Sequence, residues 1–155
     1  MTPQPLDLRE IAEDVMDDVL RRSQEEGKPM ALSLDAPKVL PRVIGDAERI
    51  RQVIDNLVDN AYHYTPENGT IKVRIHALDG TEVQVDVEDD GVGIDDEFRE
   101  RLFEKGCGKG TGLGLYLIRT ICEVYGWQVE ETGNLGNGAQ FEFTIPNEKL
   151  KIDKR

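Results

Sequence analysis

Cysteine, histidine and aromatic side chains are scarce in this sequence. Its 155 residues include two cysteines, two histidines and one tryptophan. Cys107 and Cys122 form neither a CxxC motif nor a zinc-binding spacing, and so few cysteines suit a reducing compartment. We therefore expect no redox role for either cysteine and predict that Cys122 is a thiol of the core.

Long apolar runs and excess positive charge are also missing. No run approaches the length of a membrane span and no signal peptide is visible, so we expect a cytoplasmic chain, with any membrane anchor outside this sequence. Acidic residues outnumber basic ones by 31 to 19, which gives a net charge of −12. Because a nucleic acid would be repelled, we expect no such partner, and a polyanionic ligand would need a metal ion and a helix terminus.

The apolar residues that are present suffice for one domain. Hydrophobic residues make up 38% of the chain, and we assign residues 1–155 to a single domain with its core over about 5–146 and a frayed polar tail over 147–155. Hydrophobic periodicity predicts helices over residues 6–26, 46–66, 95–104 and 115–125, and strands over 30–34, 42–44, 71–77, 83–87, 127–131 and 141–145. The strands on either side of Asp79-Gly80 are predicted to form a hairpin with one buried face.

The helix predicted over residues 46–66 carries an unusual polar stripe. Asn56, Asn60 and His63 share one face at i, i+4 and i+7, beside the apolar stripe that faces the core. Asparagine is a poor helix former, so two of them one turn apart indicate a cost tolerated for ligand binding. From this helix alone, hydrogen-bonded amides at the rim of the core remain an equal alternative.

Two glycine-containing segments follow. In EDDGVGI, residues 88–94, the glycines permit close approach of the backbone to a flat ligand, and Asp89 can accept a hydrogen bond beside Ile94. A purely structural turn is the alternative explanation of these residues. The run GCGKGTGLGL, residues 106–115, leads directly into a helix whose N-terminal N–H groups could hold phosphate, with a flexible hinge as the alternative. Neither a P-loop nor a strand-fed GxGxxG turn is present.

Together these segments resemble a known family. NLVDNAYHYTP, DDGVGI, Phe103 and GKGTGLGL are similar, in this order and spacing, to the N, G1, F and G2 boxes of the histidine kinase catalytic and ATP-binding domain. PLDLREIAEDV and VIGDAERIRQVIDNL also resemble that family, so the similarity spans residues 5–146. It implies an α/β (α+β) two-layer sandwich of the Bergerat type, with a mixed β-sheet covered on one face by helices and ATP held between helices and a mobile lid.

The resemblance implies roles for the polar residues of the N box. Asn60 would coordinate Mg²⁺, and Asn56 would support the phosphate end of ATP. His63 stands where the family usually has a lysine that reaches the phosphates, so this contact would be shorter and pH-dependent. These three residues would form the catalytic set, and Tyr64 would flank the adenine.

The resemblance also implies an adenine pocket and a lid. Asp89 would accept the adenine amino group, and Phe103 would anchor the lid. The lid is shorter than is common in the family and lacks its phosphate-contacting arginine, which Lys105 or Lys109 could replace. The remaining nucleotide contacts would come from residues that shape the pocket or wrap the triphosphate, namely Gly91, Gly93, Ile94, Gly110, Thr111, Gly112, Leu113 and Gly114.

The same resemblance implies the reaction. Related ATPases place a water-activating glutamate one turn before the metal asparagine, where this chain has Asn56, so transfer to a protein is favoured over hydrolysis. The family's acceptor is a histidine followed by an acidic residue on a separate dimerisation domain, which neither His63 nor His76 matches. We therefore expect the catalytic part of a two-component sensor histidine kinase, itself monomeric, whose partners are the phosphoacceptor domain and a response-regulator receiver domain.

Other functions remain open at this point. An anti-sigma-factor-type serine kinase often has a histidine after its N-box asparagine, as His63 is here. A nucleotide sensor without transferase activity is compatible with the short lid. A chaperone-type or mismatch-repair-type ATPase clamp is disfavoured by Asn56, and an interaction domain outside nucleotide chemistry would require four ordered boxes to occur by chance.

Overall fold

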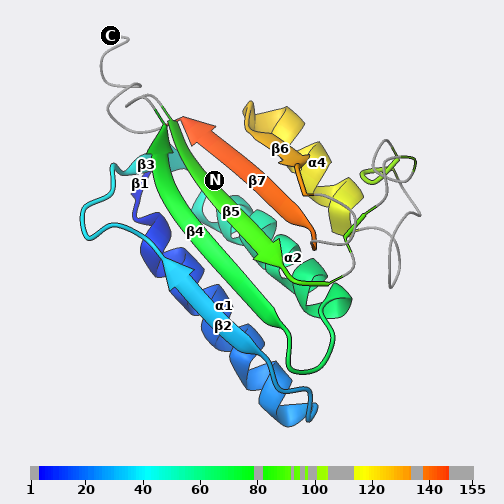
Figure 1. Ribbon diagram of the computed structural model, residues 1–155. Coiled ribbons are helices and arrows are strands. Elements are labelled where there is room, and N and C mark those ends of the chain that lie inside the picture. Colours follow the sequence, from blue (N-terminus) through cyan, green and yellow to red (C-terminus); the bar gives the residue numbers. More distant parts are fainter. Residues whose placement is uncertain are drawn as a thin grey trace, which may run out of the picture.

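The chain folds into two layers, a sheet and a set of helices on one of its faces (Figure 1). The computed structural model describes residues 4–78, 82–91, 93–94, 97, 101–104, 114–133 and 138–146. Within these residues the predicted two-layer sandwich with a mixed sheet is confirmed.

The main sheet has five strands in the order β2-β4-β5-β7-β6. Strands β2 and β4 run parallel, and the other three pairs are antiparallel. The predicted hairpin is β4 and β5, in which Val73 pairs with Val87. The strands are β2 (Ala31–Asp35), β4 (Thr70–Leu78), β5 (Glu82–Asp89), β6 (Gln128–Glu131) and β7 (Gln140–Pro146).

A second, two-stranded sheet lies beside the first. In it β1 (Gln4–Leu6) pairs antiparallel with β3 (Val43–Gly45). Strand β3 was predicted, but β1 was not, because the predicted first helix included Leu6. The helix in fact begins after Asp7, and Leu6 pairs with Val43 instead.

Three helices, α1 (Leu8–Glu25), α2 (Ala47–Tyr64) and α4 (Gly114–Tyr125), cover one face of the sheet. The side chain of Asp7 caps α1 by accepting a hydrogen bond from the N–H of Arg9 at 3.0 Å. Asp46 caps α2, accepting from the N–H of Glu48 at 3.0 Å. Helix α2 ends at Thr65, whose hydroxyl donates to the carbonyl of Ala61 at 2.6 Å.

The core lies between α2 and the strands at the centre of the sheet. Val83, Val85 and Val87 alternate along β5 with polar residues and are all buried, as is the predicted apolar stripe of α2. Cys122 on α4 is buried, which confirms its prediction as a core thiol. Because the apolar face of α2 is buried in the core, it fixes the position of the helix on the sheet and the direction in which its polar face points.

The opposite face of the sheet is polar and internally bonded. His76 lies on this face, and its Nε2 lies 3.0 Å from Oδ2 of Asp86. Asp86 is only 3% exposed and also accepts from the side chain of Gln84 at 2.7 Å. A carboxylate can be buried here because these neighbours replace its hydration.

Candidate functional site

Helix α2 presents Asn56 and Asn60 one turn apart on a half-buried face. Neither side-chain amide makes a hydrogen bond to any described part of the chain. Rim amides that stabilise the fold would have their hydrogen bonds satisfied within the protein. Both amides therefore remain open to a ligand or to water, and their role in ligand binding stays a prediction.

His63 lies one turn beyond Asn60 near the end of α2. Its side chain is about half exposed, and its Nε2 lies 3.5 Å from Oδ2 of Asp59. The imidazole also makes an edge contact with Tyr62, with ring centroids 5.8 Å apart. His63 thus belongs to the same helix face as the asparagines but is held beside a carboxylate that the sequence analysis did not single out.

The end of α2 meets the end of β5 at Gly91. A Cβ atom at this position would lie 2.5 Å from the carbonyl oxygen of Tyr64 and 3.1 Å from Oδ1 of Asp89, so only glycine lets the two segments approach this closely. This contact brings the N-box helix and the predicted adenine acceptor together. Two of the predicted boxes, separate in sequence, are therefore adjacent in space.

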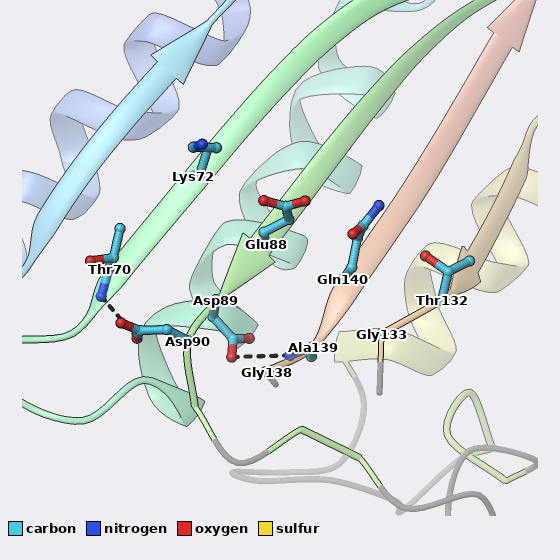
Figure 2. A pocket seen from close by; sticks show the side chains of 10 residues that line it. All are labelled: Thr70, Lys72, Glu88, Asp89, Asp90, Thr132, Gly133, Gly138, Ala139 and Gln140. Atoms are coloured by element: carbon cyan, nitrogen blue, oxygen red, sulfur yellow. Dashed lines mark hydrogen bonds between the residues drawn. The ribbon is translucent and has the colours of Figure 1, made fainter. Parts of the chain in front are cut away.

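Asp89 is fixed by backbone hydrogen bonds at the end of β5. Its Oδ1 accepts from the N–H of Gly91 at 2.9 Å. The same oxygen accepts from the N–H of Ala139 at 3.3 Å, a hydrogen bond drawn in Figure 2. Burial of the carboxylate raises the pKa of Asp89, and the two hydrogen bonds oppose this shift without cancelling it. No hydrogen bond reaches Oδ2 from the described residues, so this oxygen can accept from a ligand.

The segment that leads into β7 packs against the other side of Asp89. Gly138 adopts a φ of 87°, and a Cβ there would lie 1.8 Å from the carbonyl oxygen of Asp89. Neither Gly138 nor Ala139 was among the predicted site residues. The glycine at position 138 is the sequence feature that could have indicated this contact, because a backbone that packs against another backbone has no room for a side chain.

The structure describes some of the residues that were predicted to shape the adenine pocket and to anchor the lid. Ile94 is buried, and Gly93 adopts a φ of 83°. Phe103 is half-buried and packs edge-on against Phe141 of β7, with centroids 6.2 Å apart. Leu102 beside it is buried. These contacts are those expected of residues that anchor a segment to the core.

Most of the predicted triphosphate loop lies outside the described residues. This applies to Lys105, Lys109, Gly110, Thr111, Gly112 and Leu113, and to half of the residues of the helix predicted over 95–104. Gly114 is described and begins α4. Because α4 packs against α2, the start of the helix that follows the glycine run belongs to the same side of the sheet as the asparagines.

A hollow of about 380 Å³ lies at the same end of the sheet but on its polar face (Figure 2). Lys72, Glu88 and Gln140 line it, and they alternate along their strands with residues that face the helices. Asn56 and Asn60 do not line it. Asp89, however, does line it. The hollow therefore reaches the predicted adenine acceptor from the polar face of the sheet but does not extend to the asparagine face, so we do not identify it with the predicted nucleotide site.

Residues 45–149 match the family described as "Histidine kinase-, DNA gyrase B-, and HSP90-like ATPase". The adaptive-response sensory kinase SasA of Thermosynechococcus vestitus is 38% identical over 148 residues, which cover 91% of this chain and 38% of that kinase. This chain thus spans well under half the length of that relative. None of the described helices is both long and apolar enough to cross a membrane.

Solved structures give the same result. The nucleotide-free catalytic domain of histidine kinase ThkA matches with a TM-score of 0.82 and 33% identity, over 95% of this chain and 99% of that domain. Full-length ShkA in complex with AMPPNP matches with a TM-score of 0.86 and 30% identity, over 95% of this chain and 31% of ShkA. The chain therefore belongs to the histidine kinase-, gyrase B- and HSP90-like ATPase family, as a catalytic and ATP-binding domain of the histidine kinase type.

Proposed function

We propose that this domain binds Mg-ATP at the asparagine face of α2 and, within a longer protein, transfers the γ-phosphoryl group to a histidine on a separate dimerisation domain. The observation that carries this proposal is the pair of amides, Asn56 and Asn60, which have no hydrogen-bond partner among the described residues. They lie on the helix whose end packs against the anchored carboxylate of Asp89. One part of this arrangement suits a metal-bound triphosphate and the other an amino group on a base.

The adenine end of the site follows from the geometry of Asp89. Its Oδ1 is occupied by two backbone N–H groups, while Oδ2 has no partner among the described residues. An exocyclic amino group can donate to this oxygen, whereas the carbonyl of guanine cannot. Tyr64, Gly91, Gly93 and Ile94 would then shape the rest of the adenine pocket.

The phosphate end suits a magnesium ion held by few protein ligands. No group of three or more histidine, cysteine, aspartate or glutamate side chains among the described residues could hold a metal. Magnesium does not require one, because it commonly binds one or two protein oxygens together with phosphates and water. The amide oxygen of Asn60 provides such a ligand, and the ion would neutralise charge on the β- and γ-phosphates.

The other residues of this chain would orient the triphosphate. Asn56 and His63 lie on the same helix face as Asn60 and can donate to phosphate oxygens. Their contribution is positioning and charge stabilisation, which dominate phosphoryl transfer. We assign the same role to the residues of the glycine run and its flanking lysines: Lys105, Lys109, Gly110, Thr111, Gly112, Leu113 and Gly114. Phe103 would anchor the lid that closes over them.

The acceptor histidine and the later partner are expected outside this chain. His63 belongs to the proposed site itself, and His76 is on the other face of the sheet beside Asp86. A separate phosphoacceptor domain is therefore required, followed by a receiver domain. Support for the receiver is that histidine kinase ThkA, 30% identical with a TM-score of 0.81, was solved in complex with the response regulator protein TrrA.

Calorimetric titration with AMPPNP, with and without Mg²⁺ and with GTP as the control, tests the binding site. We expect magnesium-dependent binding that prefers adenine. Equal binding of GTP would contradict the role of Asp89, and the absence of binding would contradict the proposal as a whole. Adding a dimerisation domain with its histidine and labelled ATP then tests transfer, and light scattering tests the expected monomer.

A further inference from the structure

The proposed phosphate site is flanked by two carboxylates. Asp55 and Asp59 directly precede Asn56 and Asn60, so each amide has an acidic neighbour along α2. Burial, followed by the charge of Asp59, raises the pKa of Asp55. A negative charge at this place opposes the binding of a triphosphate.

Helix α1 provides one cation for this region. Arg22 donates a hydrogen bond from Nη1 to Oδ1 of Asp59, across 37 positions of sequence, and both side chains are about one third exposed. The hydrogen bond to Asp59 is the main cause that raises the pKa of Arg22, and the charges of Glu26 and Asp55 raise it further. Arg22 therefore sits among three carboxylates, with Asp59 as its direct partner.

A cluster of contacts holds this end of α1 against the last turns of α2. Lys28 donates from Nζ to the carbonyl of Tyr62 at 2.8 Å, and the Tyr62 hydroxyl donates to Glu26. The guanidinium carbon of Arg22 lies 5.3 Å from the centroid of the Tyr62 ring, a cation–π contact on a buried side chain. Arg22 is thus fixed in place rather than paired by chance with a surface acid.

Asp59 has a second neighbour, His63, whose Nε2 lies 3.5 Å from its other oxygen. The two carboxylate oxygens are divided between Arg22 and His63, so the charge of Asp59 is shared by them. Without Arg22, the full charge of Asp59 would remain beside the phosphate site with His63 as its remaining direct partner. That imidazole would then be held more strongly by the carboxylate than by the nucleotide.

We propose that Arg22 is a positioning residue of the nucleotide site, which neutralises Asp59 and so lowers the negative charge that the phosphates meet beside His63 and the two asparagines. This inference rests on the proposed binding of Mg-ATP at α2 and adds a residue from α1 to that site. The proposed effect of Arg22 is on the binding of the phosphates and not on the binding of the base.

Arg51 provides a matched control on the same seam between α1 and α2. Its guanidinium lies 2.9 Å from Asp18 and 3.6 Å from Asp14, and its side chain is about as exposed as that of Arg22. Arg51 precedes Asp59 by eight residues, or about 12 Å along the helix. Replacing it removes an equivalent interhelical ion pair without exposing the charge of Asp59.

The experiment compares Mg-ATP and adenosine affinities of four variants, by calorimetry for ATP and by NMR shift titration for adenosine. Arg22→Gln should weaken ATP binding ~3- to 10-fold at low salt and less at high salt, because the repulsion is electrostatic. Adenosine affinity should not change. Arg22→Gln/Asp59→Asn should return ATP affinity to within about twofold of the wild type, since the unpaired charge is gone. Arg51→Gln should bind ATP as the wild type does.

Asp59→Asn alone gives an independent test that does not remove the arginine. It should tighten ATP binding, because Arg22 is then left without its partner charge. The inference is overturned if Arg22→Gln affects adenosine as much as ATP, if the double variant remains weak, if Arg51→Gln behaves like Arg22→Gln, or if Asp59→Asn weakens ATP. Wild-type protein that does not bind ATP would instead contradict the proposed function, so the two failures are distinguishable.

Discussion

Helices α1 and α2 have the same length and cover the same face of the sheet, yet their polar faces differ. Each has 18 residues and an aspartate cap, and each buries an apolar stripe in the core. On α1 the polar face has charged side chains such as Asp18, which pairs with Arg21 and with Arg51 of α2. On α2 it carries Asn56 and Asn60, whose amides have no partner among the described residues. The apolar faces build the fold, and the difference between the polar faces locates the function.

The largest expected effect is on the free energy of unfolding, through the buried apolar stripe that each helix contributes to the core. Ile54 of α2 is fully buried, and Ile54→Ala should lower the free energy of unfolding by about 2–5 kcal/mol through lost burial and a cavity. Ile11 of α1 is only partly buried against the same core, so Ile11→Ala should cost clearly less. Urea denaturation measures both changes. Equal losses would mean that α1 contributes as much to the core as α2.

Removal of the proposed metal ligand tests the difference between the helices. Asn60→Ala should weaken Mg-ATP binding ~10- to 150-fold, the value of a hydrogen bond or ligand to a charged group, and should abolish the effect of Mg²⁺. The control is Glu13→Ala on the exposed face of α1, which should leave affinity unchanged. Persistent magnesium dependence in Asn60→Ala would show that another residue binds the metal.

Asp89→Asn should separate binding from stability. We expect ATP affinity to fall by about 1–3 kcal/mol, because the acceptor for the adenine amino group is altered. Burial raises the pKa of Asp89 in the folded state, so its contribution to stability is present in acid and is lost as pH rises through that pKa. Asp89→Asn should therefore raise the Tm at pH 7, and this gain should shrink toward pH 3, where the carboxyl is protonated in both states.

The smallest effects are expected at the two helix caps. Asp46 is buried and accepts from the N–H of Glu48 and from the hydroxyl of Tyr125, so Asp46→Ala should cost about 1–2 kcal/mol. Asp7 is exposed and, among the described residues, accepts only from Arg9, so Asp7→Ala should cost about 0.5 kcal/mol. Thermal unfolding of the two variants provides the comparison, and a reversed order would contradict it.

The helices and the hairpin could be predicted because their signals are local. The periodic apolar residues of α2, its aspartate cap and its end at Thr65 all lie within one segment, and β4 and β5 alternate around a short turn. Strand β1 could not be predicted in this way. It has three residues, one of them Pro5, and its partner β3 lies almost 40 positions later.

The residues of the candidate site also divide into those with a local sequence signal and those without one. Asn56, Asn60 and Asp89 were predicted because each belongs to a motif. The contact between Arg22 and Asp59 joins two helices through side chains that carry no motif, so nothing local in the sequence indicates it. The bond between His76 and Asp86 was within reach, since the pairing of His76 with Gln84 places Asp86 on the diagonal.

The backbone around Asp89 has a consequence for how fast and how tightly a ligand can bind. Two N–H groups hold Oδ1, and Gly138 is packed against the carbonyl, so the carboxylate has already lost its rotational freedom before any nucleotide arrives. A base that reaches Oδ2 therefore does not have to order its acceptor, a step that otherwise costs about 0.5–1.5 kcal/mol per side chain. That conformational entropy is lost during folding, and the binding step at the adenine end becomes a docking of two rigid surfaces.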